Sequence, residues 1–241
     1  MTNILLFVVL PYAALAIFLI GSIYRYLNKG FTVSSLSSQF LEGRKLFIGS
    51  QPFHWGLFFL FFGHLIAFLF PRAVIAWNGQ PVRLLILEIS AFAFGLAAFV
   101  GVILLIYRRL TTRRVQMVTS KMDLVVFAIL LTQIISGLLV AYQSRWGSSW
   151  FASFITPYLR SVFVFDPQID ALVSVNSLSL KVHVISAFAL IGLIPFTRFI
   201  HFLVYPVDYL WRSYQQVIWN WPRKNIRISR AHSEGHKSQN N

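Results

Sequence analysis

Four of the six histidines in this 241-residue sequence lie inside long apolar stretches. His54 and His64 share one stretch, and His183 and His201 share another. A polar ring inside an apolar, membrane-length segment is costly and is usually functional. Neutral imidazole binds haem iron well, and two imidazoles on one iron leave no open position, which suits an electron carrier. The four residues therefore predict two bis-histidine haem sites.

The chain contains no cysteine. This excludes disulfides, thiolate zinc sites, cysteine-ligated iron–sulfur clusters and covalent attachment of haem. Zinc on the histidines is disfavoured as well, because two histidine pairs without acidic or thiolate ligands make weak zinc sites. A redox metal in this chain is therefore expected to have mainly nitrogen or oxygen ligands.

The histidine spacing indicates how two such sites pair. His54 and His64 are ten positions apart, which is about 15 Å along a helix with an offset of about 80° around it. His183 and His201 are 18 positions apart, which is five whole turns on one face but about 27 Å in length. Antiparallel helices pair His54 with His201 on the cytoplasmic side and His64 with His183 on the exterior side. A kink at Pro195 is expected to absorb part of the difference in length.

The elements that carry these residues follow from composition. Hydrophobic residues make up 57% of the chain and charged residues 12%, whereas a soluble domain carries about a quarter charged residues. Five continuous apolar spans stand out, at residues 4–24, 53–70, 84–107, 124–142 and 180–205. Such lengths predict an all-α membrane protein, a bundle of five transmembrane helices, and exclude a barrel. The first span lacks a basic preceding region, so we expect a retained helix.

Basic residues predict the orientation. Lysines and arginines gather between spans one and two, between spans three and four, and after span five. By the positive-inside rule, the N-terminus is outside and the C-terminus is cytoplasmic, in the inner (cytoplasmic) membrane of the cell. Because the basic residues flank apolar spans, the net charge of +14 indicates membrane topology and not nucleic-acid binding. We expect a membrane domain at 1–221 and a basic, polar cytoplasmic tail at 222–241.

Two connections carry further signals. Ser120 and Asp123 form the pattern of a capping box before the fourth span. The exterior connection, residues 143–179, is polar at both ends and more apolar between them. We expect this connection to lie along the membrane surface or to cover a site.

The histidine segments resemble a known family. Residues 53–64 (FHWGLFFLFFGH), 194–201 (IPFTRFIH) and 205–210 (YPVDYL) are similar to the gamma, cytochrome b, subunit of membrane-bound respiratory nitrate reductase. Residues 18–22 (FLIGS) and 108–110 (RRL) match it too. The resemblance covers nearly the whole chain except the exterior connection and the tail.

This resemblance implies a function. It implies two non-covalent b-type haems, quinol oxidation near the exterior haem, and delivery of electrons to a cytoplasmic iron–sulfur subunit beside a molybdenum catalytic subunit. The family's quinol site includes a basic residue entering the third helix, where this chain has Arg83 in place of the family's lysine. Arginine keeps the charge but does not readily give up a proton. Gly63, next to His64, is expected to leave space for the quinone ring.

Other residues are candidates for cofactor contacts. Gly56 and Gly63 either let a flat macrocycle approach the second helix or serve ordinary helix packing. Arg109 and Arg198 either pair with haem propionates or simply mark the cytoplasmic ends of their spans. Glu88, about a turn deeper than Arg83, is a more speculative proton acceptor.

Two alternative functions stay open from sequence. One is a related dihaem anchor that serves a heterodisulfide-reductase-like or sulfite-reduction complex, because the terminal acceptor depends on the partner. The other is a small haem-free transporter or assembly factor that uses its histidines for ions or protons. Haem content discriminates this second class from a cytochrome.

Overall fold

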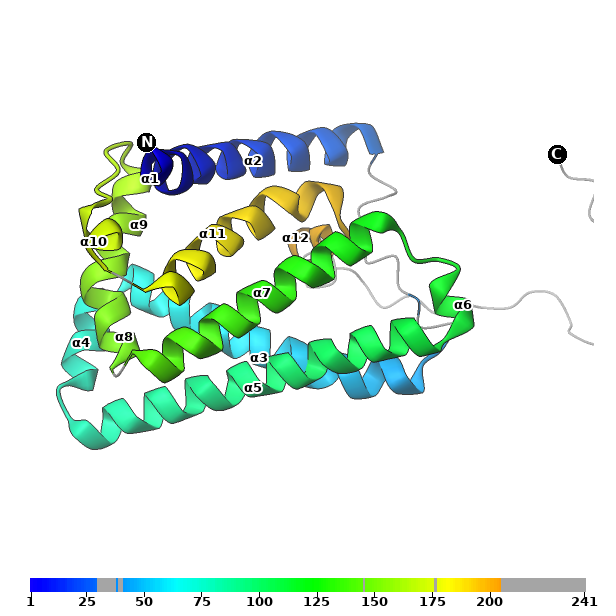
Figure 1. Ribbon diagram of the computed structural model, residues 1–241, viewed down its shortest axis with the longest axis horizontal. Helices are drawn as coiled ribbons and strands as arrows, with labels where there is room; N and C mark the ends of the chain where they lie inside the picture. Colours follow the sequence, from blue (N-terminus) through cyan, green and yellow to red (C-terminus); the bar gives the residue numbers. More distant parts are fainter. Residues whose placement is uncertain (30–37, 39–40, 145, 176, 205–241) are drawn as a thin grey trace, which may run out of the picture. The chain divides into compact units, whose positions relative to one another are not determined.

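The structure, a computed structural model, describes residues 1–29, 38, 41–144, 146–175 and 177–204, and regular structure within these ranges is helical throughout (Figure 1). Five helical stretches are long and apolar enough to cross a membrane: Thr2–Lys29, Arg44–Leu69, Pro81–Thr111, Lys121–Gln143 and Leu178–Phe196. The predicted five-span, all-helical architecture is confirmed. The expected tail, 222–241, lies outside the described residues.

The spans are built from the following elements. The first span joins α1 (Thr2–Ile4), the π-helical turn η1 (Leu5–Val9) and α2 (Leu10–Lys29). The next three are α3 (Arg44–Leu69), α5 (Pro81–Thr111) and α7 (Lys121–Gln143), and the last begins with α11 (Leu178–Leu193). Short helices connect them: α4 (Pro71–Asn78), α6 (Arg113–Gln116), α8 (Gly147–Trp150), π-helical η3 (Phe151–Ile155), α9 (Thr156–Phe163) and α10 (Asp170–Ser174).

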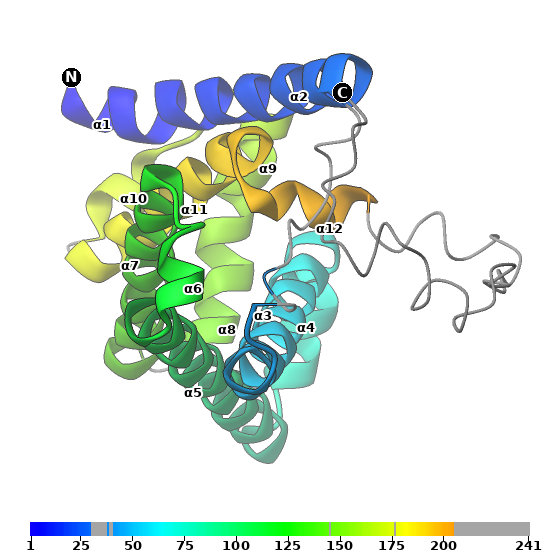
Figure 2. The same cartoon turned by 90° about the vertical axis from the view of Figure 1, so that its right-hand side faces the viewer.

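Each long helix packs on the next in a spatial order that differs from the chain order. α2 packs on α11, α11 on α7, α7 on α5, and α5 on α3 (Figure 2). The N-terminus lies at the same end as α4 and α8–α10, whereas α6 lies at the opposite end (Figure 1). Consecutive spans therefore alternate in direction, so α3 and α11 are antiparallel.

The predicted fourth-helix cap is present. The Ser120 hydroxyl accepts from the Asp123 backbone N–H at 3.1 Å, and the Ser120 N–H donates to the Asp123 carboxylate at 2.9 Å. This reciprocal pair satisfies two of the donors that a helix start leaves free. It also fixes the Asp123 carboxylate at this end of the bundle.

The fifth span is not the continuous helix expected over 180–205. After α11 the chain makes two 3₁₀ turns, η4 (Ile194–Phe196) and η5 (Arg198–Ile200), before the short α12 (His201–Val204). Pro195 lacks the N–H that would continue the helical hydrogen bonding. The Arg25 guanidinium of α2 donates to the carbonyl oxygens of Pro195 and Thr197 at 2.6 and 2.9 Å. This contact satisfies backbone groups at the break.

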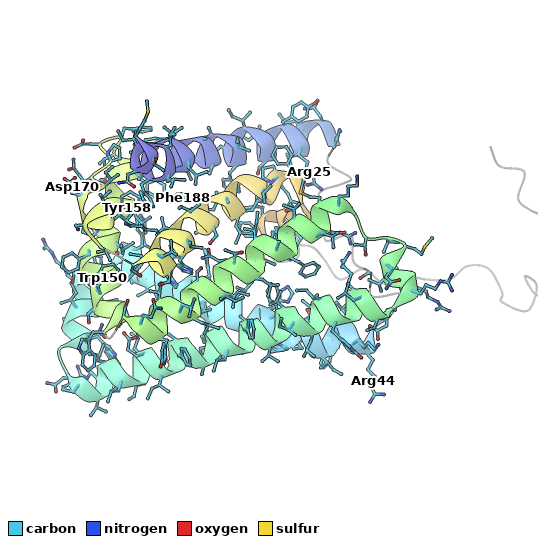
Figure 3. The ribbon with its side chains drawn as sticks, in the orientation of Figure 1. Arg25, Arg44, Trp150, Tyr158, Asp170 and Phe188 are labelled. Atoms are coloured by element: carbon cyan, nitrogen blue, oxygen red, sulfur yellow. The ribbon has the colours of Figure 1, made fainter. Side chains whose placement is uncertain are left out.

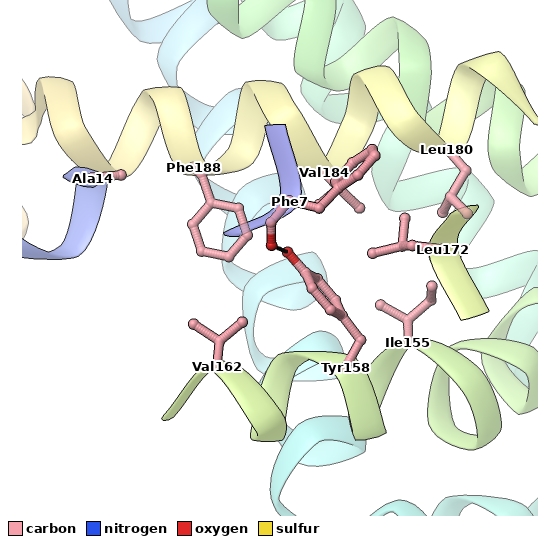
Figure 4. Close-up of a cluster of buried hydrophobic side chains, with 9 residues drawn as sticks. All are labelled: Phe7, Ala14, Ile155, Tyr158, Val162, Leu172, Leu180, Val184 and Phe188. Carbon is pink, nitrogen blue, oxygen red and sulfur yellow. Dashed lines mark hydrogen bonds between the residues drawn. The ribbon is translucent and has the colours of Figure 1, made fainter. Parts of the chain in front are cut away.

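The connection that we expect to be exterior folds into the packed segment α8–α10, called the exterior segment below for that expectation. Its side chains form a buried core with α2, η1 and α11 (Figures 3 and 4). Tyr158, which is 1% exposed, donates its hydroxyl hydrogen to the carbonyl of Phe7 at 2.9 Å (Figure 4). Burial of this phenol raises its pKa well above the ordinary value. The segment is thus an integral part of one end of the bundle.

Candidate functional site

The histidines of α3 are held by their own helix. The Nδ1 of His54 lies 2.8 Å from the Ser50 carbonyl and 3.0 Å from the Ser50 hydroxyl. The Nδ1 of His64 lies 2.7 Å from the Leu60 carbonyl. A carbonyl oxygen can only accept, so Nδ1 carries the hydrogen in both rings and Nε2 keeps the lone pair. This is the tautomer that binds metal through Nε2.

The structure brings the four histidines together in the expected pairs. His54 faces His201 with 6.4 Å between the ring centroids and 66° between the ring planes. His64 faces His183, also at 6.4 Å, with 39° between the planes. The Nδ1 of His201 donates to the Arg198 carbonyl at 2.6 Å. α3 thus meets the fifth span at two depths of the bundle.

The ring separation fits one metal ion between each pair. An imidazole nitrogen lies about 2 Å from a bound transition metal ion and about 1.1 Å from its ring centre, so two axial imidazoles place their centroids about 6 Å apart. Both observed separations, 6.4 Å, agree with this value. Within the described residues no cluster of three or more histidine, cysteine or acidic side chains could hold a metal ion. A two-ligand site suits a metal that brings its other ligands with it, as haem iron does.

The break after α11 resolves the length difference between the two spans. A straight helix would separate His183 and His201 by about 27 Å, against about 15 Å for the pair on α3. The two 3₁₀ turns that follow Leu193 redirect the chain, and His201 begins α12 opposite His54. The predicted kink at Pro195 is therefore a full helix break.

His183 has an environment that sequence reasoning missed. Its Nδ1 donates to the Gln133 carbonyl of α7 at 3.0 Å and lies 3.2 Å from the Ser136 hydroxyl. The Gln133 amide nitrogen lies 3.3 Å from Nε2 of His183, and the amide oxygen accepts from Ser186 at 2.5 Å. Polar residues inside apolar spans are themselves a functional signal. That signal could have singled out these residues.

Phe151 is a second residue that sequence reasoning missed. Its ring contacts the His64 ring edge-to-face, with 5.1 Å between centroids. Phe151 also packs on the small cluster of Ala67, Val74 and Ala152, which joins η3 to α3 and α4. The exterior segment therefore covers part of the His64 region, one of the two arrangements expected for it.

The two candidate glycines of α3 have different surroundings. A Cβ at Gly56 would lie 2.6 Å from the Phe94 carbonyl oxygen and 2.7 Å from the Ala98 nitrogen of α5. Close packing of α3 on α5 accounts for glycine at this position. Gly63, in contrast, has nothing within 4 Å of its Cβ position. The Gly63 side of α3, one position before His64 in the chain, is therefore exposed and open.

Arg109 and Arg198 converge on one carboxylate. Arg109 lies 3.0 Å from Asp123 Oδ2, and Arg198 Nε lies 3.2 Å from Asp123 Oδ1. Arg109 also donates to the Thr119 hydroxyl at 3.0 Å. The two arginines are thus close together at the α6 end, with Asp123 between them. Their pairing with propionates stays a prediction.

Two further candidates lie at the opposite end of the bundle. The Arg83 guanidinium lies over the Trp77 ring, 5.1 Å from its centroid. The Glu88 carboxylate accepts from the Ser148 N–H at 2.8 Å and from its hydroxyl at 2.5 Å, which ties α5 to α8. Quinol binding at Arg83 stays a prediction, and Glu88 has a structural contact of its own.

The sequence matches the family model described as "Nitrate reductase gamma subunit" over residues 3–220. This chain belongs to that family. It is similar to the nitrate reductase gamma chain of Bacillus subtilis, with 33% identity over 89% of this chain and 97% of the relative. The respiratory nitrate reductase 1 gamma chain of Escherichia coli is 32% identical over 89% of this chain and 96% of its own length. The nitrate reductase-like protein NarX of Mycobacterium tuberculosis is 33% identical over 87% of this chain and 33% of its own length.

Membership of the nitrate reductase gamma family, together with five apolar spans, makes this chain a multi-pass membrane protein. The family match spans α3 and the fifth span, so both histidine pairs lie within the matched region.

Proposed function

We propose that this chain is a membrane cytochrome b subunit that oxidises quinol near the exterior side and passes electrons to a cytoplasmic nitrate reductase. The observation that carries the proposal is the pair of histidine couples, each with 6.4 Å between ring centroids. The gamma chains of Bacillus subtilis and Escherichia coli, which this chain resembles along nearly its whole length, support the nitrate partner.

His54, His201, His64 and His183 would hold two non-covalent b-type haems. When bound, these groups supply one-electron redox chemistry at two depths. The chain's own contribution is positioning. Nδ1 hydrogen bonds fix each ring, so the residue does not need to reorient on binding. Antiparallel α3 and α11 set the two pairs apart along the span direction.

The exterior pair is the proposed neighbour of the quinol site. Gly63 leaves space beside His64, and Phe151 covers another part of the same ring. An aromatic edge and an open glycine face suit a flat apolar ring. Arg83 of α5, which lies over the Trp77 ring of α4, would supply positive charge near the quinol oxygen.

The cytoplasmic end is the proposed docking side for the iron–sulfur and molybdenum subunits. Exposed arginine and lysine side chains flank this end: Arg113, Arg114 and Lys121. By the positive-inside rule, we infer that the N-terminus lies outside and that the chain lies in the inner membrane. The same charges attract anionic lipid.

A reduced-minus-oxidised spectrum with haem quantification tests the proposal. We expect b-type bands and about two haems per chain, the number that bis-histidine ligation by four residues allows. His64→Ala is expected to remove one haem and abolish quinol oxidation. The other histidine of α3, His54, faces His201 and cannot replace His64 opposite His183. His232→Ala, a histidine outside the two pairs, is the matched control and should keep both haems. Colourless wild-type protein would contradict the proposal.

A further inference from the structure

The four paired histidines are not held alike. Three of them donate Nδ1–H to a carbonyl within four residues of themselves, and these carbonyls belong to Ser50, Leu60 and Arg198. His183 instead donates across to the Gln133 carbonyl of a different helix, α7. α7 carries none of the paired histidines, so one ring depends on a helix that has no ligand of its own.

Helix α7 approaches this ring closely at three successive contacts. The Gln133 carbonyl and the Ser136 hydroxyl lie 3.0 and 3.2 Å from Nδ1. Ser136 donates its own hydrogen to the Gln133 carbonyl at 3.1 Å, which leaves the hydroxyl oxygen free to accept from His183. At Gly137, an added Cβ would lie 2.8 Å from the Cε1 atom of His183. Only glycine lets the imidazole lie against α7 in this position.

We infer that α7 is the positioning element for His183: Gln133 and Ser136 set the basicity of the ring, and Gly137 sets its plane. This inference rests on the function proposed above, because it concerns His183 as an iron ligand. The Gln133 carbonyl, the Ser136 hydroxyl and Gly137 would act through the His183 ring. At His183 these contacts come from a separate helix, whereas the Nδ1 partners of His54 and His201 lie in their own segments.

The physical consequence follows from second-shell chemistry. A hydrogen bond from Nδ1–H makes Nε2 a stronger electron donor, which favours the oxidised metal and lowers the reduction potential. Two acceptors on one N–H strengthen this effect, and in a membrane interior little water competes with them. Loss of the Ser136 hydroxyl therefore raises the potential of the exterior site. Displacement of the ring by a methyl group at position 137 would change the angle between the His64 and His183 ring planes.

Ser136→Ala and Gly137→Ala test the inference in the full-length, haem-loaded protein. The readouts are potentiometric titration of each haem and the low-spin ferric electron paramagnetic resonance signal, which responds to the angle between axial ring planes. The signal lost in His64→Ala identifies the exterior site. We expect an upward shift of the exterior potential in Ser136→Ala. In Gly137→Ala we expect a displaced exterior signal or the loss of one haem of two, with the cytoplasmic signal unchanged.

Two matched controls separate positioning from general damage. Thr132→Ala removes an exposed hydroxyl of α7 that donates to the Ala128 carbonyl of its own helix, and should change neither site. Ser50→Ala removes the hydroxyl 3.0 Å from His54 Nδ1 and should shift the cytoplasmic site instead. Unchanged exterior potential and signal in both α7 variants would overturn the inference, as would equal shifts at both sites. Wild-type protein without haem would contradict the proposed function itself.

Discussion

Glu42, just before α3, forms an ion pair with the buried Arg108 of α5. Arg108 is 3% exposed, and its Nε lies 2.8 Å from the Glu42 carboxylate. The same guanidinium donates to the carbonyls of Ser38 and Glu42 at 3.0 and 2.6 Å. Partial burial works against the charge on Glu42, but hydrogen bonds from the Lys45 backbone, the Arg108 side chain and the Leu46 backbone outweigh it. The pKa of Glu42 is therefore lowered.

This lowered pKa predicts a loss of stability in acid. The contribution of Glu42 is fully present above the ordinary glutamate pKa of about 4.3 and is lost as pH falls through its lower folded value. Glu42→Gln should destabilise the protein at neutral pH, because it removes the negative charge that faces the buried Arg108 guanidinium. Thermal unfolding in detergent measures the difference. The difference in unfolding temperature between wild type and variant should become smaller in acid. A difference that stayed the same would contradict the role of this carboxylate.

The break in the fifth span depends on a neighbouring helix. Pro195 ends the regular hydrogen bonding, and Gly21 of α2 lets it approach closely: a Cβ at Gly21 would lie 2.9 Å from the Pro195 Cβ. Four residues along α2, Arg25 donates to the freed carbonyls on both sides of the turn. The first span therefore stabilises the conformation that presents His201 to His54.

Arg25→Ala is expected to affect selectively the haem that we propose between His54 and His201. Each hydrogen bond from a charged donor contributes about 1.5–3 kcal/mol, and both bonds hold the turn that precedes His201. We expect the variant to lose or weaken the cytoplasmic haem while it retains the exterior one, as measured by haem quantification and potentiometry. Arg44→Ala is the matched control, because Arg44 points away from the bundle (Figure 3). Equal loss of both haems would contradict this prediction.

The exterior segment connects the ends of three spans. Its core includes residues of η1, α9 and α11, and Tyr158 provides the hydrogen bond that joins α9 to η1. The packing places Phe151 of η3 on His64. The stability of this end and the environment of the exterior pair are therefore linked.

Tyr158→Phe should lower the unfolding temperature. The variant keeps the ring but leaves the Phe7 carbonyl without its partner, at a cost of about 1–3 kcal/mol. Tyr142→Phe, at a tyrosine that is 80% exposed, is the control and should have no effect. Thermal unfolding in detergent compares the two. An equal response from both tyrosines would show that the buried hydrogen bond is not the cause.

The sequence was sufficient for the features that the bilayer dictates. Span length and antiparallel order follow from apolar runs, and these placed His54 opposite His201 and His64 opposite His183. The break after Leu193 could be placed near Pro195, but its geometry depends on Arg25, 170 residues away along the chain. The contacts of His183 with α7 and the shared partner of Arg109 and Arg198 were not predictable either. Both depend on side-chain packing between spans, which no local pattern encodes.

His201 begins a helix of four described residues that leads directly into residues 205–241. Residues 205–241 contain further arginines and lysines, and we expect them to contribute to the proposed engagement of the soluble subunits. A force on residues 205–241 would reach His201, a proposed iron ligand, within a few peptide bonds. The three other proposed ligands lie inside long helices. Binding of the soluble subunits should therefore change the absorption spectrum of the haem proposed between His54 and His201. The haem proposed between His64 and His183 would serve as an internal reference.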